Sequence, residues 1–187
     1  MKKVDMTNVE EAKSGGSQRH PAGPYVCKIT NVVDVPDKEY LKVSYDIIKG
    51  DFAGYYSKGR EEHPDWEWFG SYVKSYKPAA LPMLKRFCSA VTKSNANYVF
   101  DAGAANNDEQ TLVGKQIGLT FREEEYYGND GDLKTRLIIY SEFPVDKIGE
   151  QKVPSVKKLK EEKTSNAAEA DGFMNIPENI GDTIPFS

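Results

Sequence analysis

The sequence is poor in cysteine and histidine and has no long apolar run. It contains 2 Cys and 2 His among 187 residues. Cys27 and Cys88 lie far apart and lack the spacing of a metal-binding pair, so both are interpreted as small buried apolar residues. No apolar stretch is long enough to span a bilayer, and the N-terminus lacks the pattern of a signal peptide. These absences predict a cytoplasmic protein that does not contact a membrane.

Sequence motifs of catalysis are also missing. The chain has neither a glycine-rich phosphate loop nor the pentapeptide of a nucleophile elbow. His20 and His63 each precede a proline, a context that is typical of solvated loops. Residues 123–125 are glutamates, but neighbours on a strand face opposite sides, which favours a charged strand end over a metal cradle. We therefore expect no enzyme, no cofactor and no bound metal.

The charge balance is weakly acidic. The net charge is −4, and acidic residues outnumber basic ones between His20 and Glu150. The broad basic field of many nucleic-acid-binding proteins is therefore absent. A nucleic-acid site in this chain would have to be a local patch.

Changes in composition divide the chain into three parts. Residues 1–23 contain a Ser-Gly-rich segment followed by proline and are predicted to form a flexible arm. Residues 24–150 have the length and patterning of one folded domain. Residues 151–187 are charged, then small and polar, and are predicted to form a disordered tail. Isolated apolar residues in such a tail are typical of a docking motif, although packing on the chain's own domain is an alternative.

Alternating apolar and polar residues predict five strands and one helix. The strands are expected at residues 25–34, 39–49, 66–74, 112–127 and 132–143. The helix is expected at residues 78–94, with Pro82 in its first turn. Tyr55 and Tyr56 are interpreted as an extended run and residues 60–65 as a loop. The helix falls between the third and fourth strands, an order that matches a five-stranded OB-like barrel in a mostly-β (α+β) domain.

Aromatic and basic side chains are interleaved around the predicted third strand, and more cations follow on the last two strands. Single-stranded nucleic acid needs rings on which its bases stack and cations that meet its phosphates. Neighbouring rings on a strand cannot all point inward, so we expect some of these rings at the surface, with Trp66 and Trp68 on one face. A purely structural role remains the alternative for each ring, as does a solvated outer face for the cations. The candidate nucleic-acid-binding residues are Tyr55, Tyr56, Lys58, Arg60, Trp66, Trp68, Tyr72, Lys74, Lys77, Arg122, Lys134 and Arg136.

The last residues printed are Asp182-Thr183-Ile184-Pro185-Phe186-Ser187, an acidic residue shortly before an Ile-Pro-Phe triplet. This end resembles the tip of bacterial single-stranded-DNA-binding proteins, where an acidic stretch precedes Ile-Pro-Phe and the phenylalanine fills a pocket on a partner enzyme. The resemblance implies that Asp182, Ile184, Pro185 and Phe186 bind partner proteins. Ser187 displaces the terminal carboxylate by one residue, which should weaken docking in the standard pocket.

Residues 37–43, 81–87, 125–131 and 172–177 resemble segments of a family of small phage and prophage proteins from Gram-positive bacteria. These proteins occur among replication and recombination functions and are described as similar to single-stranded-DNA-binding proteins. The resemblance implies binding of single-stranded DNA during phage or prophage replication or recombination, in the cytoplasm of a bacterial host cell. Replication or recombination proteins would be recruited through the tail.

Other functions stay open on the sequence alone. The chain is alternatively a protein-interaction adaptor of a phage replication module that touches no DNA, a nuclease, or a structural virion component. The oligomeric state is also open, and a homo-oligomer is one of the alternatives.

Overall fold

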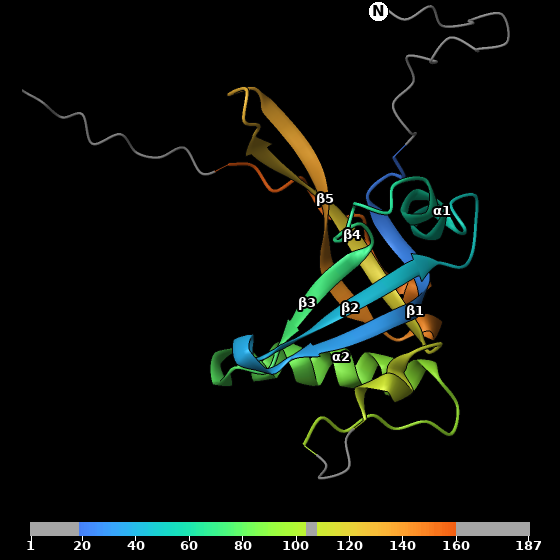
Figure 1. The fold of residues 1–187 in the computed structure, drawn as a ribbon. Coiled ribbons are helices and arrows are strands. Elements are labelled where there is room, and N and C mark those ends of the chain that lie inside the picture. Colours follow the sequence, from blue (N-terminus) through green and yellow to red (C-terminus); the bar gives the residue numbers. More distant parts are fainter. Residues whose placement is uncertain (1–18, 104–107, 160–187) are drawn as a thin grey trace, which may run out of the picture.

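The computed structural model describes residues 19–103 and 108–159. They form a five-stranded antiparallel sheet with the strand order β3-β2-β1-β4-β5 (Figure 1). The strands are β1 (Gly23–Val35), β2 (Tyr40–Ile47), β3 (Ser71–Ser75), β4 (Gln116–Tyr127) and β5 (Leu133–Phe143). The main helix, α2 (Leu81–Ser94), follows β3 and precedes β4, and a shorter helix, α1 (Tyr55–Glu62), follows β2. Single 3-10 turns occupy Pro36–Lys38, Pro78–Ala80, Glu109–Leu112 and Val145–Glu150.

The predicted fold class is confirmed: the chain is mostly β, with five strands and its main helix between the third and fourth. The sheet is open and not a closed barrel. Within the described residues no backbone ladder joins β3 to β5, the two outermost strands. Both strands therefore present an edge to the gap between them.

The core lies between the concave face of the sheet and α2, which crosses one end of the sheet (Figure 1). Strand alternation puts apolar side chains on that face, among them Ile29 in β1 and Phe121 in β4, both fully buried. The helix adds Phe87 and Val91, one turn apart, from its apolar side. The largest side chains thus meet at the centre, as the periodicity of the sequence predicts.

The extended run expected at Tyr55 and Tyr56 is wrong, because these residues begin α1. The cause is a tertiary contact. The carboxylate of Asp46, buried at the end of β2, accepts hydrogen bonds from the backbone N–H groups of Tyr56 (3.0 Å) and Ile47 (2.9 Å). A side-chain acceptor from a neighbouring strand thus satisfies a donor in the first turn of the helix.

The third strand is shorter than predicted. It begins at Ser71, and residues 66–70 form turns that end at Gly70, whose φ is 67°. A Cβ at Gly70 would lie 2.7 Å from atoms of Tyr56 and Arg60, so glycine is required there for both space and conformation. Since Trp66 and Trp68 lie in this turn, the expectation that they share a strand face is wrong.

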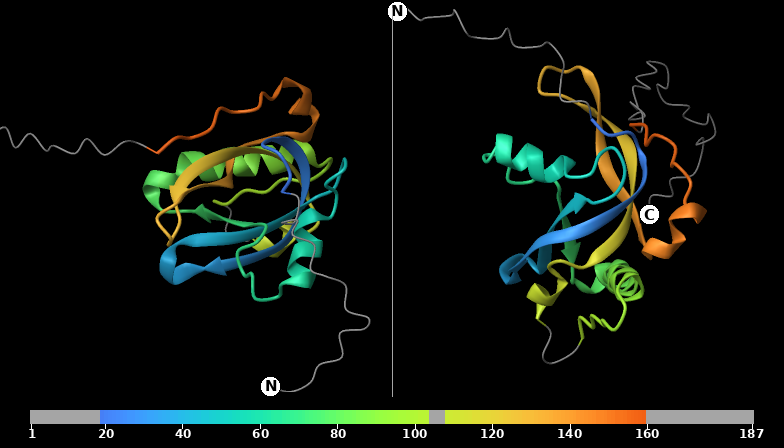
Figure 2. Two further views of the ribbon diagram at one scale, coloured as in Figure 1. Left: turned by 90° about the horizontal axis from the view of Figure 1, so that it is seen from above. Right: turned by 90° about the vertical axis from the view of Figure 1, so that its right-hand side faces the viewer.

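Residues before and after the predicted domain of residues 24–150 also pack on the sheet. His20 is buried, and residues 151–159, here called the strap, run alongside β4. The N–H of Lys157 donates to Glu123 O (2.8 Å), and the N–H of Glu125 donates to Lys157 O (2.9 Å). In Figure 2 (right), α1 and the segment that carries the strap lie on opposite sides of the β4–β5 hairpin.

Most of the predicted arm and tail falls outside the described residues. This includes the docking residues Asp182, Ile184, Pro185 and Phe186. Among the helices of the described residues, none combines the length and apolarity needed to cross a membrane.

Candidate nucleic-acid interface

The gap between β3 and β5 has two different ends, and the first is closed by a buried ion pair. Lys74 of β3 contacts the carboxylate of Glu142 in β5, and the exposed fractions of these residues are 8% and 6%. Arg86 of α2 donates to the same carboxylate, with 3.1 Å between Nη2 and Oε2. Side-chain charges thus join the strands where no backbone ladder does.

At the other end the strands leave a groove of about 330 Å³. We define the groove by its lining residues: Arg19, Tyr45, Tyr55, Tyr56, Trp68, Phe69, Gly70, Ser71, Tyr126, Thr135, Arg136 and Leu137. One wall is the turn that leads into β3, and the other is the β4–β5 hairpin. An open groove between sheet strands that is lined by rings and arginines has the composition that single-stranded nucleic acid requires.

Trp68 is the most accessible of the candidate rings. Its exposed fraction is 51%, and the ammonium of Lys42 lies 4.3 Å from the centroid of its ring. Lys42 belongs to β2 and pairs with Val73 in the ladder to β3, which brings it to the side of the Trp68 turn. A flat ring and a cation that no described carboxylate pairs with are therefore in contact at the surface.

Trp66 has a different environment, although it is only two residues away. Its ring stacks on His63 with a centroid distance of 4.0 Å and an interplanar angle of 12°. It does not line the groove, and its exposed fraction is 44%. The two tryptophans thus form a natural pair for comparison, one at the groove and one outside it.

The arginines of the groove are held by carboxylates of β4. Arg19 pairs with Glu123 (3.2 Å) and donates to the carbonyl of Thr135 (2.7 Å). Arg136 pairs with Glu124 (2.7 Å), which also receives the ammonium of Lys157. Lys157 and then Arg136 lower the pKa of the Glu124 carboxyl, so it stays ionised. A phosphate that approaches these arginines must compete with the carboxylates.

Behind the groove, His20 sits in a cage of aromatic rings. Its Nε2 lies 2.7 Å from the hydroxyl of Tyr56, and its ring contacts Tyr25, Tyr55 and Phe121. Burial lowers the pKa of His20, so the neutral imidazole is favoured. This contact ties the start of the described chain to α1 and supports the groove from inside.

Four of the candidate residues serve the interior. Tyr56 is buried in the core, and Lys74 forms the buried ion pair. Arg60 donates to the backbone carbonyls of Phe69 (3.1 Å) and Tyr45 (3.4 Å), which holds the turn that leads into β3. The hydroxyl of Tyr72 is buried without a described partner, and burial, with Glu142 nearby, raises its pKa well above the usual value. Structural roles account for these four side chains.

The other candidates fall into two groups. Tyr55, Trp68 and Arg136 line the groove. Lys58, Trp66, Lys77, Arg122 and Lys134 do not line it; among them Lys134 pairs with Asp130, and Arg122 lies over the ring of Tyr140.

The sequence pattern did not point to several charged or aromatic residues at the groove, namely Arg19, Lys42, Tyr45, Phe69 and Tyr126. Arg19 lies in the segment that was predicted to be a flexible arm. Lys42 and Tyr126 lie on correctly predicted strands; the β2–β3 pairing brings Lys42 near Trp68, and the β4–β5 hairpin brings Tyr126 near Arg136. One local signal is the pair Tyr126-Tyr127 before the β4–β5 turn. Adjacent strand residues face opposite sides of the sheet, so these two rings cannot both point inward.

No protein-family model matches this chain, and no curated protein matches it. In the part of the chain that the structure describes, no three His, Cys, Asp or Glu side chains come together as metal ligands.

Proposed function

We propose that this protein binds single-stranded DNA in the groove. One observation carries the proposal: the half-exposed ring of Trp68 lies at the groove with the ammonium of Lys42 above it. Sequence-independent binding to single strands has two components: a ring on which a base stacks and a cation that pairs with the phosphate.

Binding would proceed by exchange of partners. A base that stacks on Trp68 takes the place of the Lys42 ammonium, which then meets a backbone phosphate. Arg19 and Arg136 pair with Glu123 and Glu124. Once a phosphate competes with these carboxylates for the two guanidinium groups, both arginines add positive charge along the groove. Stacking contributes roughly 1–3 kcal/mol per base, so a few contacts give useful affinity in spite of the acidic net charge.

The test is a fluorescence-anisotropy titration of labelled oligo-dT with the full-length protein. We expect saturable binding at micromolar protein that weakens as salt rises, because counterions are released when phosphates are neutralised. A duplex of the same length should bind more weakly, since its bases are already stacked. Absence of binding at low salt would overturn the proposal.

The proposed context is phage or prophage DNA replication or recombination, with partner enzymes recruited through residues 182–187. The support is the resemblance of the chain's end to bacterial single-stranded-DNA-binding proteins. Deletion of these residues should abolish binding of partner enzymes. It should leave oligo-dT affinity equal or tighter, because an acidic tail competes with DNA for cations. Weaker DNA binding after deletion would contradict this role.

A second candidate function is a protein-interaction adaptor that binds no DNA. It is favoured by a recess of about 660 Å³ beside α2, whose lining includes Leu41, Leu81 and Leu84 together with Asp34, Asp101 and Glu109. An apolar recess with acidic neighbours suits a basic peptide better than a nucleic acid. Under this alternative, oligo-dT would not bind.

A further inference from the structure

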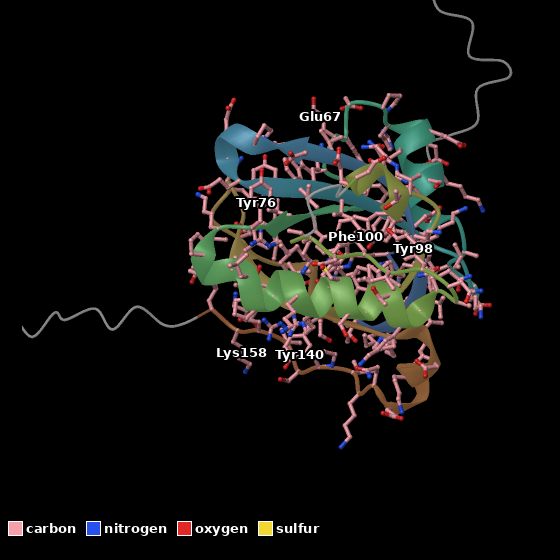
Figure 3. All side chains as sticks on the ribbon, turned by 90° about the horizontal axis from the view of Figure 1, so that it is seen from below. Glu67, Tyr76, Tyr98, Phe100, Tyr140 and Lys158 are labelled. Atoms are coloured by element: carbon pink, nitrogen blue, oxygen red, sulfur yellow. The ribbon has the colours of Figure 1, made fainter. Side chains whose placement is uncertain are left out.

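A second polar pocket lies on the β4–β5 ladder, where the strap covers it. Its volume is about 270 Å³, and it is lined by side chains of β4, β5 and the strap. Its lining includes Thr120, Arg122, Tyr140, Ser141, Lys152 and Ser155. Figure 3 shows Tyr140 and Lys158 on the same side of α2, near the strap. The pocket shares no lining residue with the groove.

Two hydrogen-bonding groups in this pocket are buried without a partner. The Thr120 residue is 1% exposed, and its Oγ1 has no hydrogen-bond partner among the described residues. Arg122 is only partly buried, but its Nε atom is buried and also has no hydrogen-bond partner among the described residues. Buried polar groups are satisfied in the great majority of cases, so two unsatisfied groups in one pocket point to a ligand that supplies the missing bonds.

The charge of the lining specifies what that ligand is. Arg122 and Lys152 are cationic, Thr120, Ser141 and Ser155 carry hydroxyls, and among the described residues no carboxylate lines the pocket. Glu142, next to Ser141 in the chain, is engaged by Lys74 and Arg86 instead. The Arg122 guanidinium lies 4.7 Å from the centroid of the Tyr140 ring, which restrains its plane. A fixed guanidinium with a second cation and hydroxyl donors suits a tetrahedral oxyanion.

We propose that this pocket binds a phosphate group through Arg122, Lys152 and the hydroxyl of Thr120. The phosphate has two potential sources, a phosphodiester of a nucleic acid or a free phosphate or phosphate monoester, and both have the chemistry that the pocket recognises. Because the pocket is separate from the groove, the proposal does not rest on DNA binding there.

The experiment follows the Arg122 Nε–H resonance of the full-length protein by NMR while inorganic phosphate is added at constant ionic strength, with chloride as the reference anion. The Arg122→Lys variant assigns the resonance. We expect a saturable shift of Arg122 Nε–H. Thr120→Val and Lys152→Met should each weaken phosphate binding by about fivefold, the equivalent of one lost hydrogen bond. Lys158→Met, a strap lysine outside the pocket, is the matched control and should leave affinity unchanged.

Folding of the variants is checked by thermal unfolding without phosphate. Thr120→Val should be at least as stable as the parent, because it removes an unsatisfied buried hydroxyl. Addition of oligo-dT then separates the two sources. Displacement of phosphate by oligo-dT identifies a phosphodiester, and retention of phosphate identifies the free anion or a monoester; both outcomes support the pocket. The absence of a saturable shift, or a shift that Thr120→Val and Lys152→Met leave unchanged, would overturn the proposal.

Discussion

The two ends of the gap between β3 and β5 differ in how their strand edges are covered. Both ends lack a backbone ladder, so both leave strand edges to be covered. At one end Lys74 crosses to Glu142 and Arg86 completes a buried cluster of charges. At the other end no ion pair between described residues crosses from β3 to β5, and a groove lined by rings remains. An open sheet can thus be closed by side-chain charges at one end and remain accessible at the other.

The largest expected effect comes from breaking the sealed end. Lys74→Met leaves the Glu142 carboxylate buried with only Arg86, which is half-exposed, as its partner. Removal of one member of a buried ion pair typically costs 3–5 kcal/mol, and we expect a loss of about 3 kcal/mol in the free energy of unfolding, measured with urea. Lys77→Met, at an exposed lysine, is the control. A loss below about 1 kcal/mol would show that the ion pair does not hold the strands together.

The next largest effect concerns the groove end. Trp68→Ala should weaken oligo-dT binding by about tenfold, which corresponds to the stacking of one base. Trp66→Ala should leave the affinity nearly unchanged, because Trp66 stacks on His63 and does not line the groove. Anisotropy titrations of the two variants check this difference. Equal losses in both would contradict the assignment of the groove.

A smaller effect is expected on the salt dependence of oligo-dT binding, where Lys42 and Lys77 should differ. Lys42→Gln should lower the slope of log affinity against log salt by roughly 1, because one phosphate contact is lost. Lys77→Gln, beyond the sealed end of β3, should not change the slope. Both slopes come from oligo-dT titrations at several salt concentrations. An unchanged slope for Lys42→Gln would place the phosphate path elsewhere.

The smallest effect lies in the aromatic cage behind the groove. Burial lowers the pKa of His20 below its ordinary value of 6.5. The unfolded chain therefore takes up a proton more readily than the folded one. The stability contributed by neutral His20 is present above pH 6.5 and is lost as the pH falls from 6.5 through the lower folded pKa.

The variant His20→Phe removes this titration and keeps a ring in the cage. Urea unfolding between about pH 7.5 and about pH 5.5 should show a steeper decline for the parent chain than for His20→Phe. Identical pH dependence in the two chains would exclude His20 as the titrating group.

Much of the sheet follows from local pattern, and the departures have identifiable physical causes. The β1–β2 and β4–β5 hairpins are predicted because alternation and turn residues are local signals. Helix α1 is not, because its first turn is satisfied by Asp46, which lies in β2. The turn at residues 66–70 is rich in aromatic residues, a composition that also favours a strand.

The site shows the same division. Trp68 and Arg136 are predictable as a ring and a cation of the right kind, and both line the groove. The sequence does not distinguish them from the structural residues Arg60 and Lys74. The partners that give those two residues their structural roles lie outside their own elements, in the turn before β3 for Arg60 and in β5 for Lys74. Residue type alone does not tell a buried cation from one at a groove.

We propose that the groove end of the gap, and in particular Trp68, receives a base of single-stranded DNA. The chain has only 2 tryptophans, so incorporation of 5-fluorotryptophan gives two ¹⁹F resonances, one for each environment. We predict that a titration with oligo-dT shifts the Trp68 resonance saturably and leaves the Trp66 resonance almost unmoved. A titration in which neither resonance moves, or in which Trp66 moves and Trp68 does not, would contradict the account.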